Sequence, residues 1–367
     1  MGKKMSLQIL VLQAIVGLIF GCFMMAPLVG QEKNSDQPAP VKRMTPELLW
    51  KLGRLGEATL SPDGKQVVYS VRKFDLESNE GSSNLYVTNV GDGKTSLIVK
   101  QWKSIGSLHW KKLEQGERIF FEGTPQAPAA ETESVDQPKN QAWSIDPVSL
   151  SLTQLTAQGD GIANLNVAPD GKRIAFTMRV KLLAEPNEIY PDLPKADARI
   201  IDQLMYRHWN QWHDYKFSHI HVANIGEGGQ TGDAIDLMKD IKADCPIPPF
   251  GGAEQFGWSP DSKEIVFAMK DVKDWAQSTN SDVYVVASDG ASAPKNISGK
   301  SPGYDRSPVY SPDGKYIAYN SMERAGFESD RNRIMVYDRG SGKTSELTVG
   351  LDPVSYTHLT LPTIYSV

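Results

Sequence analysis

The chain has 367 residues, of which 40% are hydrophobic and 23% charged, and its formal net charge is -5. This balance is ordinary for a soluble globular protein, and it excludes a largely disordered chain, a collagen-like fibre and a polytopic membrane protein. The slightly acidic charge gives no support for a nucleic-acid partner, because phosphate binding needs concentrated Lys and Arg.

The first thirty residues predict an export signal. Two lysines precede an uncharged apolar run at 9–29, and Gly30 offers a small residue for cleavage. A basic start followed by such a run is typical of a secretory signal peptide. An uncleaved membrane anchor is the alternative, because about 20 apolar residues can span a bilayer, and Cys22 leaves a lipoprotein signal as a further one. We therefore expect a signal peptide at 1–30 and a periplasmic or secreted protein.

A linker and a short helix are expected next. Residues 31–44 are polar and contain prolines, which is typical of a linker. Thr45 then suits a helix N-cap and Pro46 the first helical position, and Gly53 ends the pattern. The main domain is expected to begin with this helix and to cover 45–352.

A five-residue turn recurs four times through that domain. Its Pro presets φ at the second turn position, its Asp accepts hydrogen bonds from nearby backbone N–H groups, and its Gly accepts a positive φ. The copies are Ser61-Pro62-Asp63-Gly64-Lys65, Ala168-Pro169-Asp170-Gly171-Lys172, Ser259-Pro260-Asp261-Ser262-Lys263 and Ser311-Pro312-Asp313-Gly314-Lys315. A short apolar strand follows each copy, and a fifth, degenerate copy spans 109–121.

Each turn belongs to a larger unit. Two more strand-like segments follow, and with the segment before the turn they make four strands in a period of roughly 50 residues, which is the signature of β-propeller blades. We expect five blades, at about 58–101, 107–157, 164–240, 255–298 and 306–349. A β-sandwich is the alternative, and the phased repeats disfavour it. The predicted fold is therefore all-β, an incomplete β-propeller of about five four-stranded blades.

The blade count suggests that the chain has been cut short. Propellers close with about four to eight blades, but no later segment returns to pair with the first blade, and an open sheet edge is a liability. Within 353–367, the segment 354–363 resembles one reading frame of a transposase adaptor used in DNA sequencing libraries. A genuine divergent strand is the alternative for this tail.

The third blade carries an insertion at 180–216 that breaks the repeat. Its first part is rich in Pro and acidic residues, and its second part gathers aromatic residues, an Arg and two His. Insertions in repeat proteins often lie on one face and carry binding. We therefore expect a binding segment here, with the alternative that Trp209 and Trp212 merely cover the propeller edge.

Four histidines, His208, His213, His219 and His221, raise the alternative of a metal site. His219 and His221 share one strand face, which suits two ligands. No thiolate joins them, and Asp214 is the only close carboxylate in the sequence. Aromatic and polar packing is therefore favoured over a metal, and no cofactor is expected.

The segment Gly299-Lys300-Ser301-Pro302-Gly303 matches the G-x-S-x-G spacing of a nucleophile elbow. An elbow needs a strand before it and a helix after it, and the N–H of the residue after Ser helps to form the oxyanion hole. Here that residue is Pro302, which has no N–H. We therefore expect a loop, and no catalytic residue in this chain.

The repeats resemble a known family. The segments 44–50 and 60–65, together with Leu204-Met205-Tyr206-Arg207-His208-Trp209, resemble the prolyl oligopeptidase family of serine peptidases, in particular its acylaminoacyl peptidases and dipeptidyl peptidase V-like enzymes. In that family an N-terminal propeller caps a C-terminal α/β-hydrolase domain that holds the Ser-Asp-His triad. The triad motif is missing here. The resemblance implies a propeller that restricts access to short peptides and supplies part of the substrate site.

The substrate-binding candidates come from the insertion. They are Tyr206, Arg207, His208, Trp209, Trp212, Glu185 and Glu188. A buried carboxylate that faces an ammonium selects free N-termini, and Glu185, Glu188, Asp192 and Asp202 are candidates for it by location only.

The expected function is substrate gating in an exported serine exopeptidase of dipeptidyl- or acylaminoacyl-peptidase type, with the fragment itself inactive. The expected partners are short peptides and the protein's own α/β-hydrolase domain, and a homodimer is left open. A TolB-like periplasmic propeller that binds proteins is the alternative. A metal-dependent hydrolase that uses the His cluster is a third, and it would need bound metal.

Overall fold

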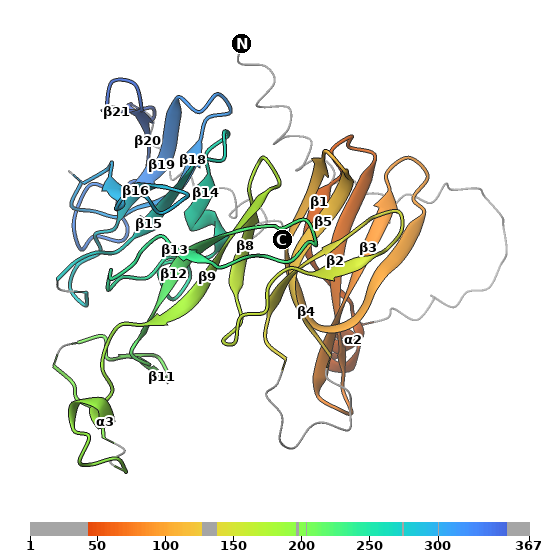
Figure 1. Cartoon of the computed structure of the whole chain (residues 1–367), viewed down its shortest axis with the longest axis horizontal. Coiled ribbons are helices and arrows are strands. Elements are labelled where there is room, and N and C mark those ends of the chain that lie inside the picture. Colours follow the sequence, from red (N-terminus) through yellow and green to blue (C-terminus); the bar gives the residue numbers. More distant parts are fainter. Residues whose placement is uncertain are drawn as a thin grey trace, which may run out of the picture. The chain divides into compact units, whose positions relative to one another are not determined.

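The computed structural model of the chain describes residues 43–126, 138–195, 198–202, 204–273, 275–299 and 301–350 (Figure 1). The predicted signal peptide, nearly all of the predicted linker and the tail at 353–367 lie outside the described residues. Within the described part of the chain, no helix is long and apolar enough to cross a membrane.

A short helix opens the described part, as the sequence predicted. Helix α2 (Pro46–Lys51) has Glu47 in its first turn and Lys51 in its last, an arrangement that suits the helix dipole. The ring of Trp50 packs edge-on against Phe74, with 5.3 Å between ring centroids. The helix is thereby held against the first strands of the domain.

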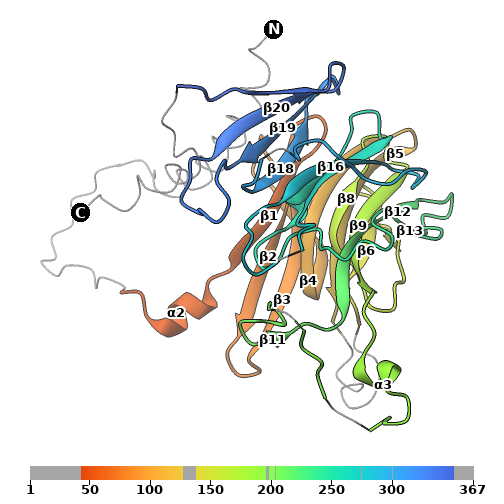
Figure 2. The ribbon, with the colours of Figure 1, turned by 90° about the vertical axis from the view of Figure 1, so that its left-hand side faces the viewer.

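Antiparallel sheets follow, and within each sheet the strands are neighbours along the chain except where the insertion intervenes (Figures 1 and 2). The first sheet contains β1 (Arg54–Leu60), β2 (Gln66–Asp75), β3 (Glu80–Asn89), β4 (Thr95–Leu113), β5 (Gly116–Pro125), β6 (Gln141–Ile145) and β7 (Leu152–Gln154). The second contains β8 (Ala163–Val167), β9 (Arg173–Lys181), β12 (Lys216–Asn224) and β13 (Ile235–Asp236). The next four-stranded sheet contains β14 (Phe256–Trp258), β15 (Glu264–Met269), β16 (Asp282–Ala287) and β17 (Lys295–Asn296). The last contains β18 (Asp305–Tyr310), β19 (Tyr316–Ser321), β20 (Arg333–Asp338) and β21 (Lys343–Glu346). The predicted all-β fold of four-stranded units is confirmed.

The first two units share one strand, which the sequence did not predict. Strand β4 pairs with β3 through its first half and with β5 through its second half, and Trp102 has a partner on both sides. Positive φ angles at Gln101 and Ser107 let the strand bend within this stretch. The first blade is therefore β1–β3 with the start of β4, and the second is the end of β4 with β5–β7. The third, fourth and fifth blades are the remaining three sheets in order.

The recurrent turns are held by local hydrogen bonds. In three copies the Ser hydroxyl donates to the Asp carboxylate at 2.7 Å, as Ser259 does to Asp261. The same Ser oxygen accepts the N–H groups of Lys263 and Glu264 at 3.1 and 2.9 Å. In this copy Ser262 takes the left-handed conformation, with φ of 62°, that Gly takes in the other three. Residues a few positions apart therefore form the turn.

Apolar cores lie between successive blades, and the central strands of the three inner blades, β5, β9 and β15, contribute side chains to the cores on both of their faces. In β15, Ile265 and Phe267 join the core that faces the third blade, whereas Val266 joins the core that faces the fifth. In β9, Phe176 and Ala175 divide between two cores in the same way. Successive side chains of a strand point to opposite faces. This explains why β9 and β15 are apolar at successive positions.

Candidate functional site

The insertion continues the hairpin of the third blade. Strands β9 and β12 pair from Arg173 and Asn224 as far as Lys181 and Lys216, so residues 182–215 extend beyond the last pair. Figure 1 shows this segment, with α3 (Pro186–Ile189) and β11 (Gln211–Trp212), beyond the ends of β9 and β12. Strand β10 (Arg207–His208) pairs with β11 in a small two-stranded sheet. The only regular structures among the described residues of the insertion are this sheet and α3.

Two of the predicted site residues stabilise the base of the insertion. Lys181 Nζ lies 2.9 Å from a carboxylate oxygen of both Glu185 and Glu188. Glu188 also accepts the backbone N–H of Glu185 at 2.7 Å. This backbone bond and then Lys181 lower the pKa of Glu188. The two glutamates thus fix α3 to the end of β9, and neither lines the cavity described next.

A cavity of about 670 Å³ lies between the insertion and two connections of neighbouring blades. Its walls come from the insertion, from the segment between β13 and β14, and from the segment between β15 and β16. The lining residues are Leu183, Arg199, Ile200, Ile201, Asp202, Leu204, Met205, Tyr206, His208, Gln211, Trp212, His213, Tyr215, Phe217, Lys242, Asp244, Pro248, Asp271, Val272, Lys273 and Trp275. The volume falls in the range of small-molecule sites, which is about 300–1,000 Å³.

Three of the seven predicted residues, Tyr206, His208 and Trp212, line this cavity. Besides the two glutamates, Arg207 and Trp209 do not. The rings of Tyr206 and Trp212 are stacked, with centroids 5.8 Å apart. Arg207 instead donates from Nε to the carbonyl of Trp209 at 2.6 Å, and its guanidinium lies 5.5 Å from the Trp212 ring. Trp209 is 69% exposed. Arg207 therefore packs on the aromatic wall, which is the stacked pair Tyr206 and Trp212, without lining the cavity, and Trp209 lies on the surface.

The cavity also holds a buried carboxylate that the sequence did not point to. Asp244 is 8% exposed, and its Oδ1 accepts the Ser218 N–H at 2.7 Å. Arg179 NH1 lies 3.8 Å from the same oxygen, and Arg179 also binds Asp214. Burial raises the pKa of Asp244 despite these partners. Of the four acidic residues proposed by location, only Asp202 lines the cavity, whereas Asp192 does not.

Asp244, Asp271 and Trp275 were missed because they belong to no repeat. They lie in the segments 237–252 and 270–281. Segment 237–252 is longer than the equivalent connections 155–162 and 297–304, and long segments in a repeat array often carry binding residues, so its length could have pointed to Asp244. Segment 270–281 is similar in length to 322–332, so length does not mark Asp271 and Trp275.

His219 has a structural role next to the cavity. It is fully buried, its Nδ1 lies 2.9 Å from Asp236 Oδ2, and its Nε2 lies 2.8 Å from the carbonyl of Ile241. A carbonyl only accepts, so Nε2 carries a proton. These bonds join β12 to the segment that carries Lys242 and Asp244. His221 stacks on Phe176, and the described residues contain no group of three side chains suited to a metal.

Two curated relatives show what the chain is similar to. It is 33% identical over 336 residues to dipeptidyl-peptidase 5 of Porphyromonas gingivalis, covering 91% of this chain and 46% of that protein. It is 32% identical to dipeptidyl-peptidase 5 of Porphyromonas endodontalis, covering 82% of this chain and 42% of that protein. The resemblance to prolyl oligopeptidase-family peptidases is confirmed. The chain spans less than half of the length of these relatives, and no protein-family profile matches it.

Solved peptidase structures share the fold of this chain. Acylaminoacyl peptidase of Pyrococcus horikoshii superposes with a TM-score of 0.55 at 18% identity, over 83% of this chain and 40% of that chain. An acylaminoacyl peptidase in complex with Z-Gly-Gly-Phe-chloromethyl ketone gives 0.56 at 17% identity, over 83% and 41%. At such identities the likeness concerns the fold.

Proposed function

We propose that the chain is the substrate-gating propeller part of an exported serine exopeptidase of dipeptidyl- or acylaminoacyl-peptidase type. The observation that carries the proposal is the cavity at the insertion, in a chain whose curated relatives are dipeptidyl peptidases. A cavity of this size accommodates a short peptide and excludes a folded protein, which is the selection that an exopeptidase needs.

The walls of the cavity suit the N-terminal end of a peptide. The stacked rings of Tyr206 and Trp212 offer apolar area to a side chain. The buried carboxylate of Asp244 offers a charge-assisted hydrogen bond to an ammonium. This pairing favours a free N-terminus and therefore the dipeptidyl type. Because burial raises the pKa of Asp244, affinity for an ammonium should fall as the pH drops through a value above the ordinary one.

The chain should not hydrolyse peptides by itself. In the segment that matches the nucleophile spacing, Ser301 donates its hydroxyl proton to the Met322 carbonyl at 2.9 Å, and strand β18 follows rather than a helix. The serine is therefore engaged in packing the fifth blade. The purified chain should leave dipeptidyl chromogenic substrates intact, and turnover by it would overturn this part of the proposal.

Binding tests the gating role. Calorimetric titration of the full chain with an unblocked dipeptide amide should show saturable binding, and the N-acetylated form should bind at least about tenfold more weakly. Asp244→Asn should remove this difference, because an amide does not carry the charge. Trp212→Ala should weaken both peptides, whereas Trp209→Ala, on the outer surface, should change neither.

The outcomes separate two claims. Absence of binding to either peptide would refute the gating role. Tighter binding of the acetylated peptide would refute the assignment of Asp244 and would favour the acylaminoacyl type.

A further inference from the structure

A buried acid pair lies at the junction of the fourth and fifth blades, and the proposed function makes no use of it. Asp305 on β18 is fully buried, and Asp282 on β16 is 9% exposed. The two strands begin side by side, because Ser281 and Tyr304 form a parallel bridge. The N–H of Asp305 donates to the Ser281 carbonyl at 2.8 Å, and the Ser281 hydroxyl donates to the Asp305 carbonyl at 3.0 Å. Neighbouring blades therefore each supply one carboxyl group to the same end of the junction.

Three of the four carboxyl oxygens of this pair have no hydrogen-bond donor. Both side-chain oxygens of Asp305 and Oδ1 of Asp282 are buried without a hydrogen bond of normal geometry. The hydroxyl of Ser321, opposite Asp305 across the ladder, is directed to the Met322 carbonyl at 3.4 Å. A buried carboxylate without donors is strongly unfavourable, whereas a protonated one carries its own donor.

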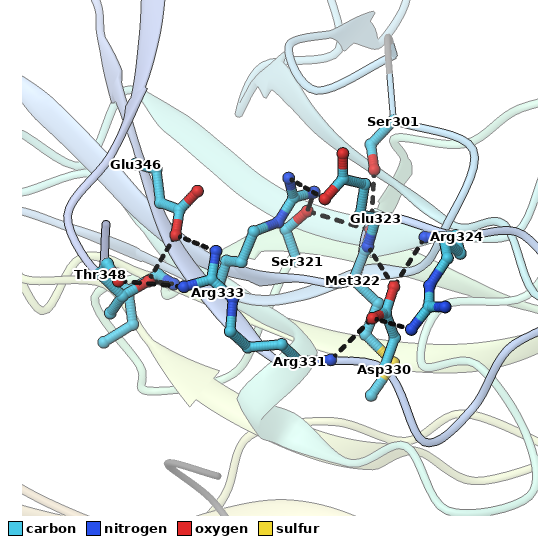
Figure 3. A network of polar contacts seen from close by, with 11 residues as sticks. Ser301, Ser321, Met322, Glu323, Arg324, Asp330, Arg331, Arg333, Glu346 and Thr348 are labelled. Carbon is cyan, nitrogen blue, oxygen red and sulfur yellow. Dashed lines mark hydrogen bonds and ion pairs between the residues drawn. The ribbon is translucent and has the colours of Figure 1, made fainter. Parts of the chain in front are cut away.

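The nearest cation does not neutralise the pair. Arg333 on β20 directs NH2 to the Ser321 hydroxyl at 3.1 Å and NH1 to Glu323 at 3.5 Å, as Figure 3 shows. Its Nε is buried without a partner. Four titratable or charged groups face the pair from the elements packed against it: Asp271, Tyr284, Tyr319 and Arg333. Glu323 lies next to Arg333. The neutral polar groups around the pair are Asn280, Asn296, Ser298 and Ser321.

The electrostatics agree with the geometry. Burial raises the pKa of Asp305 to about 7, although the nearby hydroxyls of Ser321 and Ser298 act to lower it. Asp282 adds a smaller upward contribution, and Arg333 opposes it. Burial also raises the pKa of Asp282. The described residues offer no group of three metal-ligating side chains, and a guanidinium at the site disfavours a second cation. A proton is therefore the occupant that the site favours.

We propose that Asp282 and Asp305 hold a shared proton between the fourth and fifth blades, and that release of this proton loosens the fifth blade from the fourth. With the proton in place, one carboxyl group donates to the other and only one charge is buried. Without it, two like charges face each other in a site of low polarity.

The packing around the pair makes the stability of this junction sensitive to the loss of the proton. Among the described residues, the core between the fourth and fifth blades contains six buried residues, three of them tyrosines, whereas the core between the third and fourth contains fifteen. Less apolar area therefore stabilises the junction that carries the extra charge. Because the folded state binds the proton more tightly than the unfolded chain, the stabilisation is complete below about pH 4. It is lost as the pH rises to about 7, the pKa of Asp305.

Hydrogen exchange of the full chain at pH 5 and pH 8, corrected for intrinsic chemical exchange, tests the proposal. The amides of β18–β21 should exchange at least about tenfold faster at pH 8, while those of β2 and β3 should not change. Asp305→Asn should abolish this pH dependence, because an amide binds no proton. The matched variant Asp233→Asn, an exposed site before β13, should behave as the unaltered chain does.

A second measurement keeps the proposal testable if Asp305→Asn does not fold. Infrared spectra should show a protonated-carboxyl band in the unaltered chain at pH 5 that disappears by pH 8, and Asp282→Asn should shift the pH at which it disappears. Exchange of β18–β21 that does not depend on pH in the unaltered chain would overturn the proposal. So would a pH dependence that survives in Asp305→Asn, or an infrared band that Asp282→Asn leaves unchanged.

Discussion

The blades and the insertion of this chain are built by different means. In a blade turn, Ser259 bonds to Asp261, Lys263 and Glu264, all within five residues. In the insertion, the aromatic wall and Asp244 meet from segments that are tens of residues apart. The blades therefore owe their form to local bonds and to the alternation of strand side chains, whereas the insertion depends on contacts with neighbouring blades.

This difference separates stability from binding. Blade residues are buried in the cores that join successive blades, and little of them faces the cavity. Insertion residues such as Trp212 and Trp209 are 44% and 69% exposed. Substitutions in the blades should therefore change the free energy of unfolding, and substitutions in the insertion should change ligand affinity.

The largest expected effect is that of Phe267→Ala. Phe267 is fully buried in the core between the third and fourth blades and stacks on Tyr284 with centroids 5.7 Å apart. The lost burial and the cavity left behind should lower the free energy of unfolding by about 3–5 kcal/mol in urea titrations. Phe327→Ala, at a half-exposed ring, should cost no more than about 1 kcal/mol. Equal losses for the two variants would contradict the assignment of the core.

A smaller effect is expected for the recurrent turn. Ser259→Ala should cost about 1–3 kcal/mol, because Ser259 is 1% exposed and its loss leaves the N–H of Glu264 without its acceptor. Ser311 makes the equivalent bonds to Asp313 and to the N–H of Tyr316 in the fifth blade, but it is partly open to water. Ser311→Ala should therefore cost less, as thermal unfolding of both variants can show. A larger loss for Ser311→Ala would contradict burial as the reason for the difference.

The smallest effect on stability is expected in the insertion. Trp212→Ala should change the free energy of unfolding by no more than about 0.5 kcal/mol, because the ring packs on Tyr206 outside every blade core. The same variant should lose affinity for dipeptide amides. Chemical unfolding and calorimetry on one preparation give both numbers, and a stability loss comparable to that of Phe267→Ala would remove the distinction between the two regions.

Sequence patterns predicted the blades because each rests on residues close in the chain. The turn copies, the helix begun by Thr45 and Pro46, and the apolar strands all follow from local rules. The continuous strand β4 was not predicted, because a positive φ is usually marked by Gly or Asn, and the residues that adopt it here are Gln101 and Ser107.

Only part of the candidate site could be predicted. The aromatic run marked Tyr206, His208 and Trp212, which line the cavity. Composition could not show that Glu185 and Glu188 pair with Lys181, since that depends on the chain path after β9. Asp244 could not be predicted, because it lies in the connection after β13 and comes close to the insertion only in the folded chain.

Photo-crosslinking tests the proposed peptide site most directly. An unblocked dipeptide amide with a diazirine side chain would be irradiated with the full chain, and the adducts mapped by mass spectrometry. We expect adducts at 199–217 and 271–275, which Trp212→Ala reduces and excess unlabelled dipeptide removes. Adducts on the blades alone, or adducts that excess dipeptide does not remove, would contradict a peptide site in the insertion.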